Sequence, residues 1–136
     1  MQMTVRREVF LPGDAERVWE ALTSAERLAE WFACEVELEA RPGGEGIFRW
    51  GDGSVRHAIV EAVEPVQRFA FLWFEAGEEA AATRVELELE ETEEGTRVAV
   101  TESAPAGLRA SAAGEWSWGL TLLAALPRLH AAARVT

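Results

Sequence analysis

The sequence has a single cysteine and contains no lysine, asparagine or tyrosine in its 136 residues. Because Cys34 has no second cysteine to pair with, an intrachain disulfide and a cysteine-rich zinc site are both excluded. We therefore expect a reducing, cytoplasmic location. Basic residues are also scarce, since 24 acids outnumber 13 arginines and leave a formal net charge of -11. Such a chain repels nucleic-acid phosphates and anionic lipids, so we expect no nucleic-acid partner.

Long hydrophobic runs are missing as well. No stretch approaches the roughly 18 uninterrupted apolar residues of a membrane helix, and the opening MQMTVRREVF lacks the apolar core of a secretory signal. We therefore expect no membrane insertion. The length fits a single domain over residues 1–136, and no linker, internal repeat or low-complexity segment divides it.

The apolar residues that are present recur with two periods. Residues 3–11 alternate like a strand with one buried face, whereas residues 15–22 and the segment that follows Ser24 show helical spacing. Asp14 and Ser24 stand at helix-capping positions. From Cys34 to Glu102 the period is two, with turn signals between the runs, which predicts about six antiparallel strands. The strand at 67–74 is apolar on both faces, which is typical of a covered, central strand.

The segment 111–133 returns to helical spacing and carries Trp116, Leu120 and Leu123 on one wide apolar stripe. A stripe of this width must be covered by a sheet, while Pro127 predicts a kink or an early end of the helix. The order of elements predicts an α+β fold, in which a curved antiparallel sheet of six or seven strands wraps around a long C-terminal helix. Two short helices follow the first strand. A bent sheet and a straight helix do not fit flush, so we expect a cavity between them.

Several segments, taken in their order, resemble a known family. They are ERVWEALTSAERLAEWF after the first strand, the GG and DG turns, IVEAVEPVQRFAFLW, GTRVAVTES and GEWSWGLTLLAAL. Together they resemble the START-like superfamily (SRPBCC, helix-grip fold), and within it the bacterial homologues of the activator of heat-shock protein 90 ATPase. The resemblance covers the chain from about Thr4 to Leu126. It implies a deep pocket for hydrophobic small molecules between the sheet and the C-terminal helix.

The resemblance also singles out residues at the ends of elements, at the EP-x-x-R bend, in the TE pair and on the W-x-x-x-L-x-x-L stripe. By position these are Trp31, Pro65, Arg68, Trp73, Glu102, Trp116, Leu120 and Leu123. The eukaryotic activators of this family carry a second, chaperone-docking domain, for which this chain has no room. This departure from the family pattern counts against activation of the chaperone's ATPase.

Groups that could perform catalysis or hold a metal are few. The two histidines lack metal-ligand spacing, and no nucleophile elbow, phosphate loop or dinucleotide fingerprint is present, so we expect no metal and no cofactor. His57 shares parity with Val55 and Ile59, so it either faces the pocket or lies partly in water on a hairpin strand. Val60 and Val63 differ in parity, which a bulge between them would explain.

Glu102 is the second candidate polar residue. It shares parity with Val98 and Val100, which are expected to point inward, so it is either a carboxylate inside the apolar interior or an exposed glutamate at a strand end. Were it buried, the cations that could pair with it are Arg49, Arg56 and Arg97.

The sequence is rich in large aromatic residues, with six tryptophans and six phenylalanines. Each is either plain core or part of a cavity wall. The candidate ligand-binding residues are Trp31, Phe32, Trp50, His57, Phe71, Trp73, Glu102, Trp116 and Leu120. Our leading hypothesis is non-catalytic binding of a hydrophobic small molecule by a monomer or dimer. The alternatives are a chaperone-associated interaction module with an acidic surface, and an enzyme of the polyketide-cyclase or aromatase type.

Overall fold

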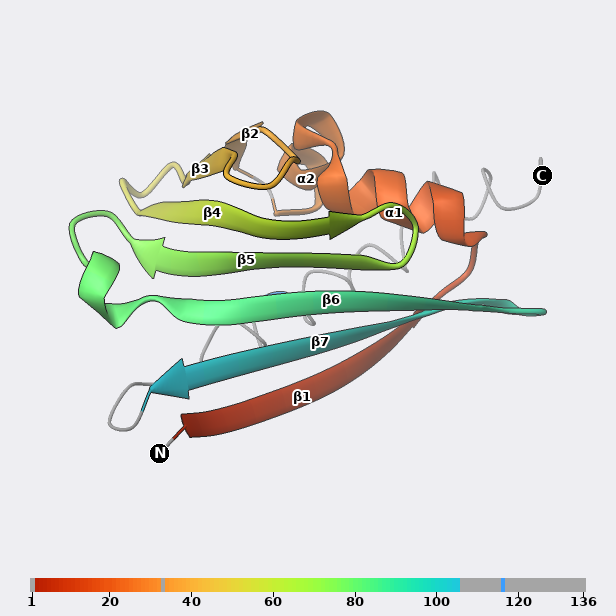
Figure 1. The fold of residues 1–136 in the computed structure, drawn as a ribbon. Coiled ribbons are helices and arrows are strands. Elements are labelled where there is room, and N and C mark those ends of the chain that lie inside the picture. Colours follow the sequence, from red (N-terminus) through yellow and green to blue (C-terminus); the bar gives the residue numbers. More distant parts are fainter. Residues whose placement is uncertain (1, 33, 106–115, 117–136) are drawn as a thin grey trace.

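The computed structural model describes residues 2–32, 34–105 and 116. The elements follow one another in the predicted order of one strand, two short helices and a run of strands (Figure 1). They are β1 (Gln2–Leu11), α1 (Ala15–Thr23), α2 (Ala25–Phe32), β2 (Glu35–Leu38), β3 (Glu45–Arg49), β4 (Val55–Glu64), β5 (Arg68–Glu75), the short 3-10 helix η1 (Glu79–Ala81), β6 (Thr83–Thr92) and β7 (Gly95–Pro105).

All seven strands form one antiparallel sheet in the order β1-β7-β6-β5-β4-β3-β2. Each strand from β2 to β7 pairs with its neighbour in sequence, and β1 closes the far edge by pairing with β7. Figure 1 shows these strands in one layer, with α1 and α2 lying together at one side. The α+β fold with a curved antiparallel sheet and two short helices after the first strand is thus confirmed. The predicted C-terminal helix, apart from Trp116, lies outside the described residues.

The helix starts follow from their capping residues. The carboxylate of Asp14 accepts the backbone N–H of Arg17 at 2.9 Å, and the hydroxyl of Ser24 accepts that of Arg27 at 3.4 Å. Each bond satisfies one of the backbone donors that the first turn of a helix leaves free. From α1, Trp19 then packs edge-on against Phe69 of β5, with ring centroids 6.2 Å apart. The caps therefore fix where α1 and α2 enter the core.

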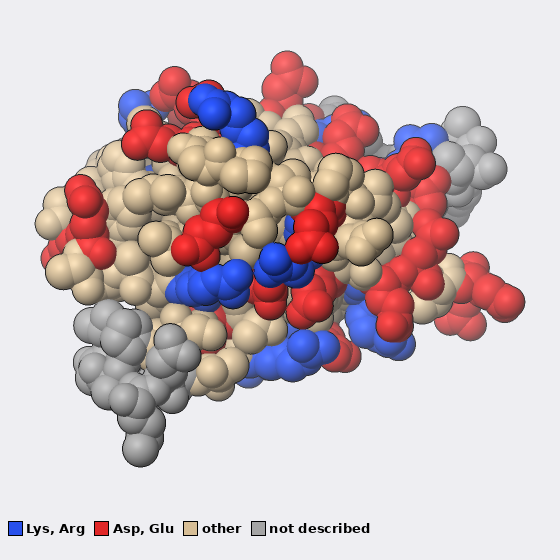
Figure 2. Space-filling model, viewed as in Figure 1, with Lys and Arg blue, Asp and Glu red and all other residues tan. Residues whose placement is uncertain are grey.

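The two faces of the sheet differ sharply in composition. Val85 and Leu87 of β6 and Val98 and Val100 of β7 are fully buried on the concave face, which carries the core. On the outer face arginines and glutamates alternate, and Figure 2 shows basic and acidic side chains lying side by side. The ion pairs there join Arg6 to Glu8, Arg68 to Glu64 and Glu86, Arg84 to Glu61, and Arg97 to Glu90.

β5 occupies the middle of the sheet, as its two apolar faces predicted. On its outer face Ala70 and Phe74 are buried, whereas Leu72 between them is half-buried. The predicted bulge in β4 is also present, because the register with β5 shifts between Val60 and Ala62. In the described part of the chain, no helix is long and apolar enough to cross a membrane.

Candidate ligand-binding site

Aromatic rings from α2, β3, β5 and the C-terminal region meet on the concave side of the sheet. We call this group the aromatic cluster, and it consists of Phe32, Phe48, Trp50, Phe71, Trp73 and Trp116. Trp116 is 1% exposed, and its ring centroid lies 4.8 Å from that of Phe32 and 5.0 Å from that of Phe71. Most contacts are edge-on or tilted, the geometry that aromatic quadrupoles favour.

Small residues in β3 and β4 make room for this cluster. Ala58 lies between Gly46 of β3 and Trp73 of β5 in the strand register. A Cβ atom at Gly46 would come within 3.0 Å of a methyl carbon of Leu38 and 3.3 Å of the Cβ of Ala58. Because neither position carries a large side chain, the rings of Phe48 and Trp73 meet across β4 with centroids 4.9 Å apart. The cluster thus follows from strand parity combined with two small residues.

The rings of the cluster pack closely. A gap bounded by cluster residues and their neighbours is too narrow to hold a water molecule, and its walls are Leu38, Phe48, Ala58, Phe69, Phe71 and Trp116. We expected an open cavity, and at this point the described side chains leave none. A ligand seated there must displace at least one ring.

Glu102 is buried, with an exposed fraction of 1%. It lies on the concave face of β7, opposite Val85 of β6 and Val5 of β1, so the strand does not end before reaching the interior. Of the two interpretations of the sequence, the one that places the Glu102 carboxylate in the interior is therefore confirmed. The arginines considered as its partners bind other acids, with Arg49 pairing with Glu37 at 2.6 Å, Arg56 with Glu75 at 3.1 Å and Arg97 with Glu90 at 2.5 Å.

His57 lies on the outer face, away from the aromatic cluster. Its ring stacks on Phe74, with centroids 5.6 Å apart and an interplanar angle of 13°. Ala58 and Val60 are the residues of β4 that point inward, so the parity that His57 shares with Val55 and Ile59 belongs to the outer surface. The interpretation that placed His57 in the interior pocket is corrected to a partly exposed strand histidine.

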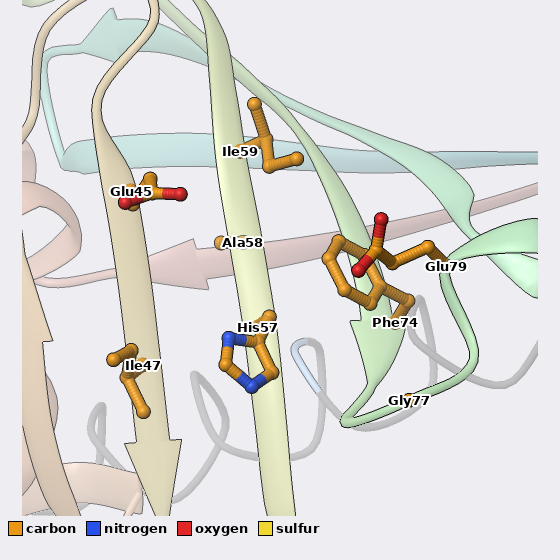
Figure 3. A pocket seen from close by; sticks show the side chains of 8 residues that line it. All are labelled: Glu45, Ile47, His57, Ala58, Ile59, Phe74, Gly77 and Glu79. Atoms are coloured by element: carbon orange, nitrogen blue, oxygen red, sulfur yellow. The ribbon is translucent and has the colours of Figure 1, made fainter.

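His57 lines a shallow hollow of about 300 Å³ on that outer face. Figure 3 shows Glu45 and Glu79 at either side of it, with the side chains of His57 and Phe74 between them. The walls are Glu45, Ile47, His57, Ala58, Ile59, Phe74, Gly77 and Glu79. This hollow is separated from the concave face by the sheet itself.

The side chains of two further predicted ligand-binding residues are not described by the structure. Trp31 belongs to α2, and Leu120 lies beyond the described residues. Phe48 is buried at the centre of the cluster, yet sequence reasoning did not select it. Phe48 lies two residues before Trp50, so both side chains point to the same face of the strand, and this spacing could have identified it. Thr83, a buried hydroxyl on β6, was missed too, although it shares the parity of the alternating run in that strand.

The described residues offer little for metal or thiol chemistry. None of their histidine, cysteine, aspartate and glutamate side chains form a group of three or more that could hold a metal ion. Burial raises the pKa of the Cys34 thiol from 9.0 to about 11, which keeps it protonated near neutral pH. Cys34 is therefore poorly suited to act as a nucleophile.

The seven-stranded antiparallel sheet with two short helices after its first strand is the arrangement of the START-like (SRPBCC) class of proteins. Within that class the chain belongs to the Activator of Hsp90 ATPase homolog 1-like family, whose family model matches residues 13–129. No curated protein matches the chain.

Solved structures with the same fold include proteins of several origins. Protein MLL2253 from Mesorhizobium loti is 25% identical, with a TM-score of 0.73 over 87% of this chain and 88% of that one. DynU16, from the dynemicin biosynthetic locus, is 30% identical with a TM-score of 0.72. The alignment covers 94% of this chain and 46% of DynU16, so this chain spans about half of that protein. The Aha1 dimer from Colwellia psychrerythraea is 19% identical, with a TM-score of 0.73 over 96% of this chain and 98% of that one.

Proposed function

We propose that the protein binds an apolar, ring-sized small molecule against the concave face of the sheet, without catalysing its conversion. The observation that carries this proposal is the aromatic cluster, which gathers rings from four separate regions of the chain. Rings gathered on a concave surface offer a large apolar contact area at little cost in side-chain entropy. The outer face, by contrast, carries ion pairs between arginines and glutamates.

The close packing of the cluster sets a condition on binding. Because the gap walled by Phe48, Phe71 and Trp116 does not admit water, a ligand that enters this gap must replace ring contacts. Trp116 is the ring whose displacement opens this space most directly, since it contacts Phe32, Phe48, Phe71 and Trp73. A ligand in this gap therefore displaces the ring of Trp116.

Tryptophan emission provides the test. Titration with an apolar dye such as N-phenyl-1-naphthylamine should quench or shift the emission saturably, with one dye bound per chain, because Trp73 and Trp116 would lie against it. Replacing Phe71 with Gln should weaken binding several-fold, since a polar group then enters the apolar surface. Native mass spectrometry of freshly purified protein would show a co-purifying small molecule directly.

Phe10 supplies the matched control for this test. It is the exposed phenylalanine of the outer face of β1, with 45% of its surface accessible. The Phe10→Gln variant should bind the dye as the unchanged protein does. Linear, non-saturable quenching, or equal loss of affinity in both variants, would show that the dye does not bind at the cluster.

Family membership supports a second candidate, a chaperone-associated interaction module. The matched family is named for an Hsp90 ATPase activator, and one protein of the same fold is an Aha1 dimer. The net charge of -11 suits a basic partner surface. In this case the protein would co-purify with an Hsp90-type chaperone in the cytoplasm, and high salt would release it.

Burial of Glu102 on the concave face favours the third candidate, an enzyme of the polyketide-cyclase or aromatase type. A carboxyl group inside an apolar site is suited to general acid–base work. Turnover of an aromatic polyketide that Glu102→Gln abolishes, with binding retained, would establish this function in place of simple binding.

A further inference from the structure

Two buried hydrogen-bonding groups, one in the aromatic cluster and one beside it, have no partner among the described residues. The indole N–H of Trp73 and the hydroxyl of Thr83 each have no hydrogen-bond partner within the described structure, although the residues are only 4% and 6% exposed. They belong to adjacent strands, β5 and β6, and are directly opposite each other in the register. Thr83 shares the concave face with Val85 and Leu87.

A buried donor without an acceptor is unfavourable, because folding removes its hydrogen bonds to water and no hydrogen bond within the protein replaces them. Native proteins leave few such groups, and a neighbouring pair calls for an explanation. The indole N–H can only donate, and the hydroxyl has a hydrogen to donate as well. One oxygen atom with two lone pairs, held between them, would satisfy both groups.

The surrounding charges restrict the type of oxygen. Arg56, on the concave side of β4, already pairs with Glu75 at 3.1 Å, so its charge is compensated. Glu102 adds an acidic group to the same face, opposite Val85, the next inward residue of β6 after Thr83. A ligand carboxylate would add a second acidic group to this face, whereas a neutral carbonyl adds no charge.

We propose that the ligand carries a neutral carbonyl group, a ketone, ester or amide, on an aromatic or other apolar body. Its oxygen accepts hydrogen bonds from Trp73 Nε1 and Thr83 Oγ1, while its apolar part lies against the aromatic cluster. This inference rests on the proposed binding function and specifies the chemical class of its ligand.

A matched pair of probes tests the inference. 2-Acetylnaphthalene and 2-isopropenylnaphthalene have nearly the same shape. The first carries a carbonyl oxygen where the second carries a methylene group. The carbonyl probe should bind about tenfold more tightly to the unchanged protein, as two good hydrogen bonds to otherwise unsatisfied donors predict. Isothermal titration or tryptophan emission gives both affinities.

Variants then assign the preference to the two donors. Thr83→Val keeps the shape of the side chain and removes the hydroxyl, so the preference for the carbonyl probe should fall to about threefold. Trp73→Phe removes the indole N–H and should lower the preference similarly. Thr101→Val, the same change on the outer face of β7, should leave the ratio at its original value. Because the free Thr83 hydroxyl has no described partner, Thr83→Val should also raise the urea midpoint of the ligand-free protein.

The outcomes separate this inference from the binding function itself. Equal affinity for the two probes, or a tenfold preference that survives both variants, overturns the carbonyl assignment while leaving apolar binding in place. A lower urea midpoint in Thr83→Val also contradicts it, because the hydroxyl then has a partner in the free protein. If neither probe binds, the binding function fails and this inference fails with it.

Discussion

Cys34 illustrates how position changes the chemistry of one residue. It lies just before β2, and burial raises the pKa of its thiol from 9.0 to about 11. At pH 8 the thiolate fraction therefore falls about a hundredfold. The higher basicity of the remaining thiolate offsets roughly one decade of that loss.

The expected result is that Cys34 in the folded protein reacts with iodoacetamide about tenfold more slowly at pH 8 than a cysteine in a short peptide. The rate should keep rising up to about pH 11. In denaturant the difference should disappear. A folded-state rate that levels off near pH 9 would show that the thiol is not shielded.

Predictions about single residues were confirmed where the structure depends on residues close by in the sequence. The caps at Asp14 and Ser24 follow from side-chain chemistry within three residues, so the sequence was enough to find them. His57 and Glu102 depended on which face of a strand points inward. For Glu102 the neighbouring valines signalled the inward face, whereas β4 is apolar on both parities and gave no such signal for His57.

At the scale of elements, the β4–β5 turn contains a strained residue. Val66 has a φ of +67°, a left-handed conformation that a β-branched side chain adopts only at a cost. Pro65 precedes it, and the N–H of Gln67 donates to the carbonyl of Glu64 at 2.9 Å, which closes the turn. This arrangement corresponds to a type II turn, whose third position favours glycine or asparagine.

Replacing Val66 with Asn should therefore stabilise the protein by about 1 kcal/mol, since asparagine tolerates the left-handed region. Urea denaturation measures the change. The same substitution at Val55, a strand residue, should instead lower stability because asparagine is unfavourable in strands. A loss of stability in Val66→Asn would mean that the packing of the valine outweighs its backbone strain.

The connection between β2 and β3 depends on Gly44. Its N–H donates to the carbonyl of Arg41 and its carbonyl accepts the N–H of Val60, both at 2.8 Å, so the turn is tied to the bulged part of β4. A Cβ atom at this position would lie 2.1 Å from the backbone oxygen of Glu39. No rotation of a side chain can relieve a contact with backbone.

Gly44→Ala should consequently cost more than about 2 kcal/mol of folding free energy, the range in which backbone strain is the cause. Gly51→Ala is the control, because nothing lies within 4 Å of a Cβ atom there. Thermal and urea unfolding of the two variants should differ clearly. Equal stabilities would show that the Gly44 turn can shift without cost.

At the scale of the whole molecule, the order of elements was predictable because most strands alternate between apolar and polar residues and clear turn signals separate them. The sequence did not predict the register that brings Trp73 opposite Thr83. It also did not predict that small residues would let the ring of Phe48 reach that of Trp73. These features depend on strands far apart in sequence, and alternation alone does not fix their pairing. The other five rings of the aromatic cluster could be predicted from the sequence, but Phe48 and the contacts between the rings could not.

The C-terminal stripe remains a prediction for the whole fold. Trp116 is buried among rings of α2, β3 and β5, as its position at the start of that stripe predicts. If Leu123 continues the stripe onto the concave face, Leu123→Ala should cost about 2 to 5 kcal/mol. An unchanged melting midpoint in this variant would refute the packing.

The binding of an apolar molecule at the aromatic cluster is tested most directly by fluorine NMR of protein labelled with 5-fluorotryptophan. Trp73→Phe and Trp116→Phe variants assign the two resonances, and 2-acetylnaphthalene is the titrant. The resonances of Trp73 and Trp116 should shift saturably with one common dissociation constant, while that of Trp19, outside the cluster, should move least. Unchanged resonances at Trp73 and Trp116 up to the solubility limit of the titrant would contradict the account.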